Sequence, residues 1–211
     1  HLNLKKLDEN GFDIISFEDD KTEYPHAQGF ENFIQQLTNY FPEEKENLLN
    51  YCQKIKEVCK AFPLYNLESK GKYNDEILAL NAKETIDSFT QNEKLKAVLA
   101  GSNFLYAGIA EKSPFYVHAL VVNSYIESSW RCINGGSQIT KQLLKQLKKY
   151  GGEFFKHKEV IQFEVENQKV NSVKMKDGTE VSGTYFISNI EPKTTLKMAG
   201  QENFRKPFFN R

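Results

Sequence analysis

The chain has 211 residues, of which 39% are hydrophobic and 27% are charged, and this composition is ordinary for a globular protein with one large or two small domains. Lysine plus arginine and aspartate plus glutamate both number 28, so the formal net charge is zero. That balance argues against a nucleic-acid-binding protein, because nucleic-acid recognition needs an excess of basic residues clustered on one face.

The first part of the chain predicts two short strands and then two helices. Residues 12–17 form a β-prone run that ends in the turn residues 18–20, and residues 22–24 can return as a partner strand. Apolar residues at i, i+3, i+4 and i+7 predict two helices over 29–61, the second of which begins at Pro42.

The middle of the chain is also predicted to be mostly helical. Short helical pieces are expected at 77–80 and 92–99, and a third piece, at 85–89, is either a helix or a turn. A longer helix begins at Ser113-Pro114, with serine at the N-cap and proline at the first helical position. It is expected to end near Ser128.

The second half of the chain changes from a helix to strands. Asn134-Gly135-Gly136-Ser137 precedes a helix that ends at Gly151-Gly152. From residue 153 the apolar period becomes two, and this alternation predicts four strands, over 154–155, 160–165, 170–175 and 181–187. Asp177-Gly178 is a hairpin signal within this region. The segment Ser188-Asn189-Ile190-Glu191-Pro192 then leads into a helix through Leu196.

The cysteines do not predict a disulfide scaffold, because there are three of them and Cys52 and Cys59 lie two helical turns apart, too far for a relaxed bridge. No spacing of cysteine and histidine predicts a metal site. The longest apolar run is too short for a membrane span, and we expect no signal peptide. We therefore expect a cytoplasmic location, with peripheral membrane contact left open.

The motifs between residues 134 and 192 resemble those of the phytoene-desaturase-like FAD oxidoreductases, which include carotenoid desaturases, isomerases and retinol saturases. Asn134-Gly135-Gly136-Ser137 looks like the family's proline-glycine-glycine turn, and residues 188–192 look like its serine-asparagine-alanine-x-proline segment. Earlier, Gly29-Phe30-Glu31-Asn32-Phe33, preceded by a proline and followed by Phe41-Pro42-Glu43-Glu44, looks like the retinol-saturase branch.

The resemblance implies an FAD domain built from separate pieces, with a substrate domain inserted between them. The implied reaction is oxidation, reduction or isomerisation of a carbon–carbon double bond in an apolar isoprenoid, retinoid or carotenoid-like substrate, with FAD as the cofactor and NAD(P) as an optional second carrier. The family's Gly-x-Gly-x-x-Gly motif is absent here. We therefore expect a fragment that is inactive alone and whose partner is the remainder of its own polypeptide.

The expected architecture is α+β, in three segments. Residues 1–130 are expected to form a mostly helical substrate domain with a few strands. Residues 131–200 are expected to contribute the Gly-Gly helix and an antiparallel sheet of three to four strands to the FAD domain. Residues 201–211 are expected to be a truncated tail.

The resemblance assigns Val160 as the valine whose backbone N–H and C=O meet the adenine of FAD, with an ordinary strand valine as the alternative. Gly135 and Gly136 would line the cavity near the flavin ring, or serve only as a turn. A tunnel for an apolar polyene would use the aromatic-rich stretch 104–130, which core packing also explains. The lining candidates are Phe104, Tyr106, Phe115, Tyr116, His118, Tyr125 and Trp130.

No catalytic residue is predicted, because no nucleophile motif is present. His118 would act as a general acid only if it faced the flavin, and a lone histidine on an apolar helix is more often a core residue. Two other functions stay open: a stand-alone module that binds a hydrophobic ligand or a protein, and a fragment of a flavin amine oxidase.

Overall fold

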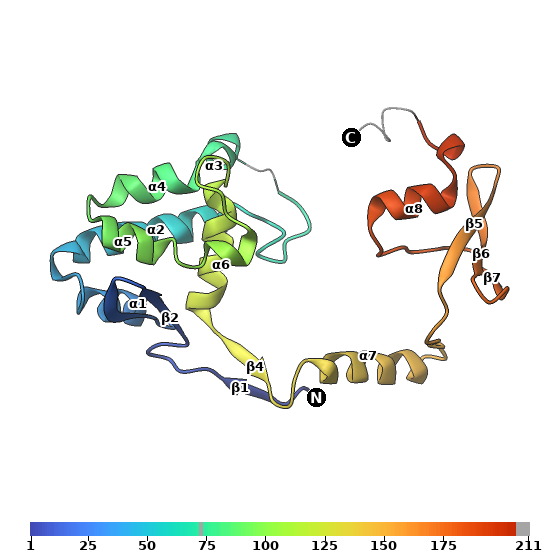
Figure 1. Cartoon of the computed structure of the whole chain (residues 1–211), viewed down its shortest axis with the longest axis horizontal. Helices are drawn as coiled ribbons and strands as arrows, with labels where there is room; N and C mark the ends of the chain where they lie inside the picture. Colours follow the sequence, from blue (N-terminus) through green and yellow to red (C-terminus); the bar gives the residue numbers. More distant parts are fainter. Residues whose placement is uncertain (72–73, 206–211) are drawn as a thin grey trace. The chain divides into compact units, whose positions relative to one another are not determined.

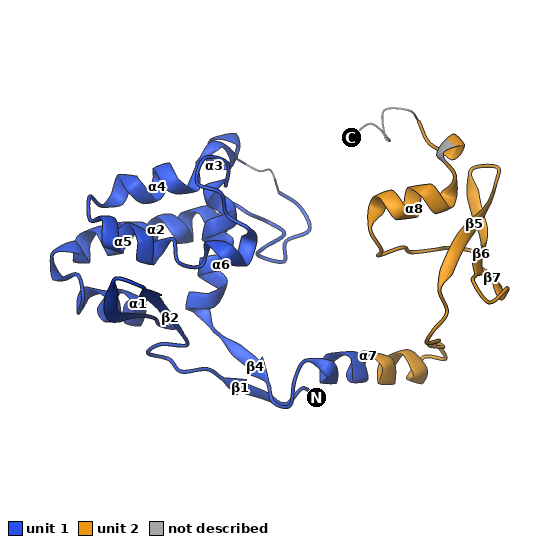
Figure 2. Cartoon of the chain, viewed as in Figure 1, with its two compact units in different colours: residues 1–142 blue, residues 143–211 orange. Residues whose placement is uncertain are grey.

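The computed structural model describes residues 1–71 and 74–205, and the chain divides into two compact units, 1–142 and 143–211 (Figure 2). The described residues form eight α-helices and several small antiparallel sheets (Figure 1). The predicted α+β class is therefore confirmed.

Unit 1 contains two antiparallel ribbons. Strand β2 (Asp13–Phe17) pairs with β3 (Asp20–His26), which confirms the predicted N-terminal hairpin. Strand β1 (Leu4–Lys6) pairs with β4 (Trp130–Cys132), at the other end of the unit's sequence. Strand β4 was not predicted, because three residues directly after a helix are too few to show an alternating pattern.

The rest of unit 1 is mostly helical. Its helices are α1 (Phe30–Thr38), α2 (Lys45–Lys60), α3 (Asp75–Ala79), α4 (Ala82–Phe89), α5 (Glu93–Leu99) and α6 (Phe115–Glu127), with 3-10 turns η1 (Pro42–Glu44) and η2 (Asn103–Tyr106). The side chains of Asn74, Asn81 and Asn92 cap α3, α4 and α5 by accepting backbone N–H groups. The N-cap of α6 is Pro114, so the prediction of Ser113 there was wrong. The Ser113 hydroxyl instead accepts a hydrogen bond from the preceding loop.

Helices α2 and α6 form the centre of the core of unit 1. Helix α6 is apolar on nearly every side, which is typical of a helix surrounded by other elements. The Cys59 thiol of α2 lies 3.5 Å from the carbonyl oxygen of Ala119 in α6. Burial raises the pKa of both Cys52 and Cys59 to about 12, so these free thiols stay protonated and unreactive at neutral pH.

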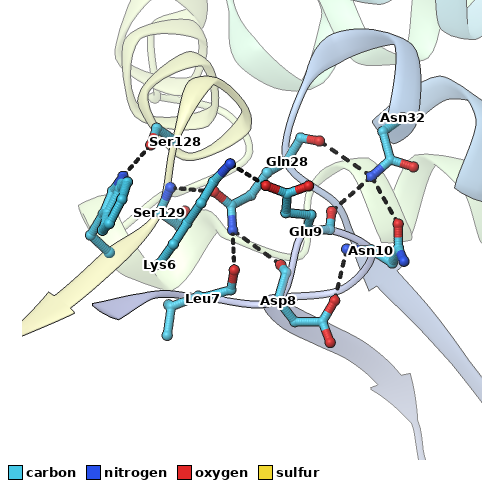
Figure 3. A network of polar contacts seen from close by, with 10 residues as sticks. Lys6, Leu7, Asp8, Glu9, Asn10, Gln28, Asn32, Ser128 and Ser129 are labelled. Atoms are coloured by element: carbon cyan, nitrogen blue, oxygen red, sulfur yellow. Dashed lines mark hydrogen bonds and ion pairs between the residues drawn. The ribbon is translucent and has the colours of Figure 1, made fainter. Parts of the chain in front are cut away.

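The buried side chain of Gln28 forms hydrogen bonds with the segment before the helical region and with the segment after it (Figure 3). Its Nε2 donates to the carbonyl oxygens of Leu7 (2.9 Å) and Asp8 (3.0 Å), and its Oε1 accepts from the backbone N–H of Ser129 (2.7 Å). The Leu7 N–H also donates to the Ser129 carbonyl at 3.0 Å. Residues 7 and 129, on either side of the helical region, are therefore adjacent.

Unit 2 holds a three-stranded antiparallel sheet in the order β5-β6-β7. The strands are β5 (Val160–Glu166), β6 (Lys169–Met175) and β7 (Glu180–Ser182), and the predicted Asp-Gly turn joins the last two. Helix α8 (Pro192–Ala199) packs against β5. Within the described residues β5 pairs only with β6, so its other side is an edge of the sheet.

Two strand predictions in unit 2 were wrong. Residues 154–155 are not in a strand, because they have no pairing partner among the described residues. The predicted strand 181–187 ends at Ser182. The register of β7 against β6 places residue 185 opposite Lys169, where β6 begins, so no partner remains for residues 186–187.

Helix α7 (Ser137–Lys149) contains the boundary between the two units. The helix was predicted, and its four lysines are exposed to solvent. Its apolar residues Ile139, Leu143 and Leu147 are also exposed. Across 1–71 and 74–205, none of the helices combines the length and the apolarity needed to cross a bilayer.

The structural boundary after residue 142 does not test the functional roles expected for the segments. The assignment of 1–130 to substrate binding and of 131–200 to flavin binding stays a prediction. In the expected tail, 201–211, the structure shows a 3-10 turn η3 (Gln201–Asn203), and residues 206–211 lie outside the described residues.

The Gln28 contacts generate a stability prediction. Replacing Gln28 with alanine removes three hydrogen bonds that join residues 7–8 to Ser129, and should lower the free energy of unfolding by about 2 kcal/mol. Urea denaturation followed by circular dichroism measures this change. The control Gln35→Ala alters an exposed side chain and should shift stability by less than about 0.5 kcal/mol. Equal changes in the free energy of unfolding for the two variants would contradict the stabilising role of the Gln28 hydrogen bonds.

Candidate functional site

The predicted lining residues of unit 1 do not surround one cavity. Phe115 and His118 have no exposed surface and belong to the core. Phe104 and Trp130 lie on the outside, with 73% and 53% of their surface exposed. Tyr125 is also partly exposed. The structure therefore distributes these five aromatic residues between the core and the surface.

The other two candidates pack against specific partners. Tyr116 stacks on Phe62, with 5.1 Å between ring centroids. Tyr106 is partly buried and its hydroxyl lies 2.9 Å from Nδ1 of His118. Tyr106 and His118 are therefore the one pair among the seven lining candidates for which a direct side-chain hydrogen bond is seen in the described residues.

His118 is the centre of a chain of four hydrogen-bonded side chains. Its Nε2 lies 2.7 Å from the hydroxyl of Tyr51, and its Nδ1 contacts Tyr106, whose hydroxyl donates to Oδ1 of Asn103. An amide oxygen only accepts, so the Tyr106 proton points to Asn103. His118 must then donate from Nδ1 and accept at Nε2 from Tyr51. The geometry therefore assigns one direction to every hydrogen bond in the chain.

The three ionisable side chains of this hydrogen-bonded series are neutral at pH 7. Burial, followed by the charge of His26, lowers the pKa of His118 from 6.5 to about 4. Burial also raises the pKa of Tyr106 to about 12 and that of Tyr51 well above its usual value. These four hydrogen-bonded side chains can accept and donate hydrogen bonds, but they carry no charge with which to bind an ion.

The outer end of this chain borders a cavity of about 290 Å³ that lies wholly within unit 1. Asn103 and Tyr106 line it together with residues of α4, α5 and the loop before α6. Tyr51 and Asn103 were not predicted as site residues. Tyr51 is separated from His118 by 67 positions, and no local spacing reveals such a contact.

Unit 2 contains a larger hollow, of about 560 Å³, whose wall is mainly apolar. Val160 at the start of β5 lines it, and so do Ser188 and Asn189 from the segment before α8. Phe163, Val170, Val173, Phe186 and Ile187 add apolar surface. The structure thus brings together two of the motifs that the sequence singled out, although they are far apart in the chain.

The backbone of Val160 faces the open edge of β5. Val160 is paired with Met175, and the N–H of Lys176 donates to the carbonyl of Glu159 at 2.8 Å. In an antiparallel ladder this pattern marks a pair that does not exchange hydrogen bonds with each other. The N–H and C=O of Val160 therefore point away from β6, as a backbone contact with a ligand would require.

Gly135 and Gly136 lie in an exposed turn before α7. Asn134 and Gly135 both have positive φ, 64° and 92°, and the Gly135 N–H donates to the Cys132 carbonyl at 3.1 Å, which closes the turn. A Cβ added at Gly135 or Gly136 would meet no atom of the described residues within 4 Å. The described residues give a conformational reason for Gly135, and a ligand contact at either glycine stays a prediction.

The buried histidines predict acid sensitivity. Burial lowers the pKa of both His26 and His118 to about 4 in the folded protein. As the pH falls below 6.5, these two histidines are therefore protonated in the unfolded protein before they are protonated in the folded one. Their stability contribution is complete above pH 6.5 and lost towards pH 4, roughly 3 kcal/mol for each histidine. Thermal unfolding measured between pH 6.5 and pH 4 should show this loss of stability, and His118→Gln should make the dependence of stability on pH shallower. The exposed control His157→Gln should leave that dependence unchanged. Identical pH dependences for the two variants would refute the prediction.

No protein-family model matches the chain. An all-trans-retinol 13,14-reductase from Danio rerio is 25% identical to it over 167 residues, which is 68% of the chain and 27% of that protein. The chain thus spans about a quarter of the length of this relative. At this identity the similarity supports a distant, retinol-saturase-like relationship to an oxidoreductase.

Proposed function

We propose that the chain is part of an FAD-dependent oxidoreductase that acts on a carbon–carbon double bond of an apolar, isoprenoid-like substrate such as a retinoid. The observation that carries the proposal is the hollow of unit 2, where Val160 and Ser188-Asn189 line the same apolar wall. The distant similarity to a protein named as a reductase of all-trans-retinol supports the substrate class.

The residues of the hollow fit the adenine end of FAD. The outward N–H and C=O of Val160 offer one donor and one acceptor to the edge of a purine. The apolar side chains of Phe163 and Val173 border the same hollow and suit the faces of a flat ring. FAD, when bound, supplies hydride transfer, and the protein supplies position and electrostatics. The pyrophosphate contacts would come from the remainder of the polypeptide.

Unit 1 fits the role of an inserted substrate domain. The Leu7 N–H and Ser129 carbonyl are hydrogen-bonded, and β1 and β4 run side by side beyond them (Figure 1). A domain whose first and last residues are adjacent can be accommodated between two pieces of another domain without distorting it. Its exposed aromatic residues Phe104, Tyr125 and Trp130 would then contribute apolar surface for the substrate.

The backbone contact of Val160 is testable in the full-length protein. Val160→Pro removes the outward N–H without breaking a bond to β6, and should lower the bound flavin per protein at least fivefold. Val160→Ala keeps the N–H and should lower it less than twofold. Flavin released by acid from the purified variants gives the measurement, and circular dichroism checks that both fold. Equal flavin content in both variants would exclude the contact.

The proposed function itself is tested by the absorbance spectrum of the full-length protein and by its products. Bands of oxidised flavin and a change of one double bond in an added retinoid, detected by chromatography, are the expected results. Conversion of an amine instead would indicate a flavin amine oxidase. A folded, colourless full-length protein that leaves polyenes unchanged would refute the proposal.

A further inference from the structure

The cavity of unit 1 has features of a binding site separate from the flavin contact. It measures about 290 Å³, at the lower end of the range for ligand pockets. Several of its lining residues are small and leave space between the surrounding elements: Ala82, Ala97, Ala100, Gly108 and Ala110. The polar chain from His118 ends at this cavity in Tyr106 and Asn103.

The charged residues of the cavity compensate one another. Lys83 forms an ion pair with Asp87, and Lys96 lies 2.7 Å from Glu93 and 4.0 Å from Asp87. Two cations and two carboxylates leave no net charge to attract an ion. The side chain of Lys96 is only 15% exposed, so an ionic ligand would also have to disrupt a partly buried pair. The charges therefore favour a neutral ligand.

The hydrogen-bonding groups at the cavity define what a neutral ligand must carry. Tyr106 accepts from His118 and gives its proton to Asn103, so the Tyr106 oxygen can only accept a further hydrogen bond. The Asn103 amide nitrogen can only donate, and no described residue accepts from it. A hydroxyl group matches this pair, because it donates to Tyr106 and accepts from Asn103.

We propose that this cavity binds a small neutral molecule with a hydroxyl group on an apolar body, held by Tyr106 and Asn103. The buried Tyr51–His118 pair keeps Tyr106 oriented and acts as a positioning element. The cavity is formed by unit 1 alone. Binding here is thus independent of the flavin contact in unit 2, and failure of one proposal leaves the other unaffected.

The test uses the 211-residue chain labelled with ¹⁵N and titrated with benzyl alcohol or with toluene, which lacks the hydroxyl. Benzyl alcohol should shift the amide signals of Gly108 and Ala110 and bind about fivefold more tightly than toluene, as expected for one added hydrogen-bonded group. Tyr106→Phe should reduce that preference to less than twofold. Ala97→Leu should weaken both ligands, because it narrows the cavity.

The matched control is Tyr65→Phe, which also removes a tyrosine hydroxyl bonded to α6. The Tyr65 hydroxyl contacts Asn123 (2.8 Å) and Ser124 (2.9 Å), and Tyr65 does not line the cavity. This variant should keep the full preference for benzyl alcohol. Equal affinities of the two ligands, shifts confined to other parts of the chain, or unchanged binding to Ala97→Leu would overturn the proposal. The result for Ala97→Leu tests the proposal even if Tyr106→Phe does not fold.

Discussion

Tyr51 of α2 and His118 of α6 meet at the centre of unit 1, where neither side chain has exposed surface and a 2.7 Å hydrogen bond joins them. A polar group buried without a partner costs about 1–3 kcal/mol. The two helices must therefore keep the axial and rotational position that satisfies both groups. Apolar packing alone tolerates small shifts between helices, whereas this bond selects one arrangement. The orientation of Tyr106, and with it one wall of the unit 1 cavity, depends on that arrangement.

The sequence predicts the elements that local patterns specify. The i, i+3, i+4 spacing before and after Pro42 predicts α1 and α2, and Asp177-Gly178 predicts the β6–β7 turn. The pairing of β1 with β4 is not predictable in this way, because nothing near Leu4 specifies a partner at Cys132. The end of β7 depends on the length of its neighbour β6. These features require knowledge of the register between distant segments.

The candidate sites show the same division between local and distant information. Val160 and Ser188-Asn189 could be selected from the sequence by their resemblance to a family pattern. Their position on one hollow, and the outward direction of the Val160 backbone, follow from the fold of the sheet and from the pairing with Met175. Asn103 could not be selected, since its role comes from a hydrogen bond to Tyr106 in the same short turn and from the cavity beside it.

The pairing of Leu7 with Ser129 has a consequence for how such a chain can diversify. Lys6 and Trp130 are opposite each other in an antiparallel ribbon, so a two-residue turn such as Asn-Gly could join β1 directly to β4. The intervening helical region could then be exchanged for another of different size without redirecting the strands on either side.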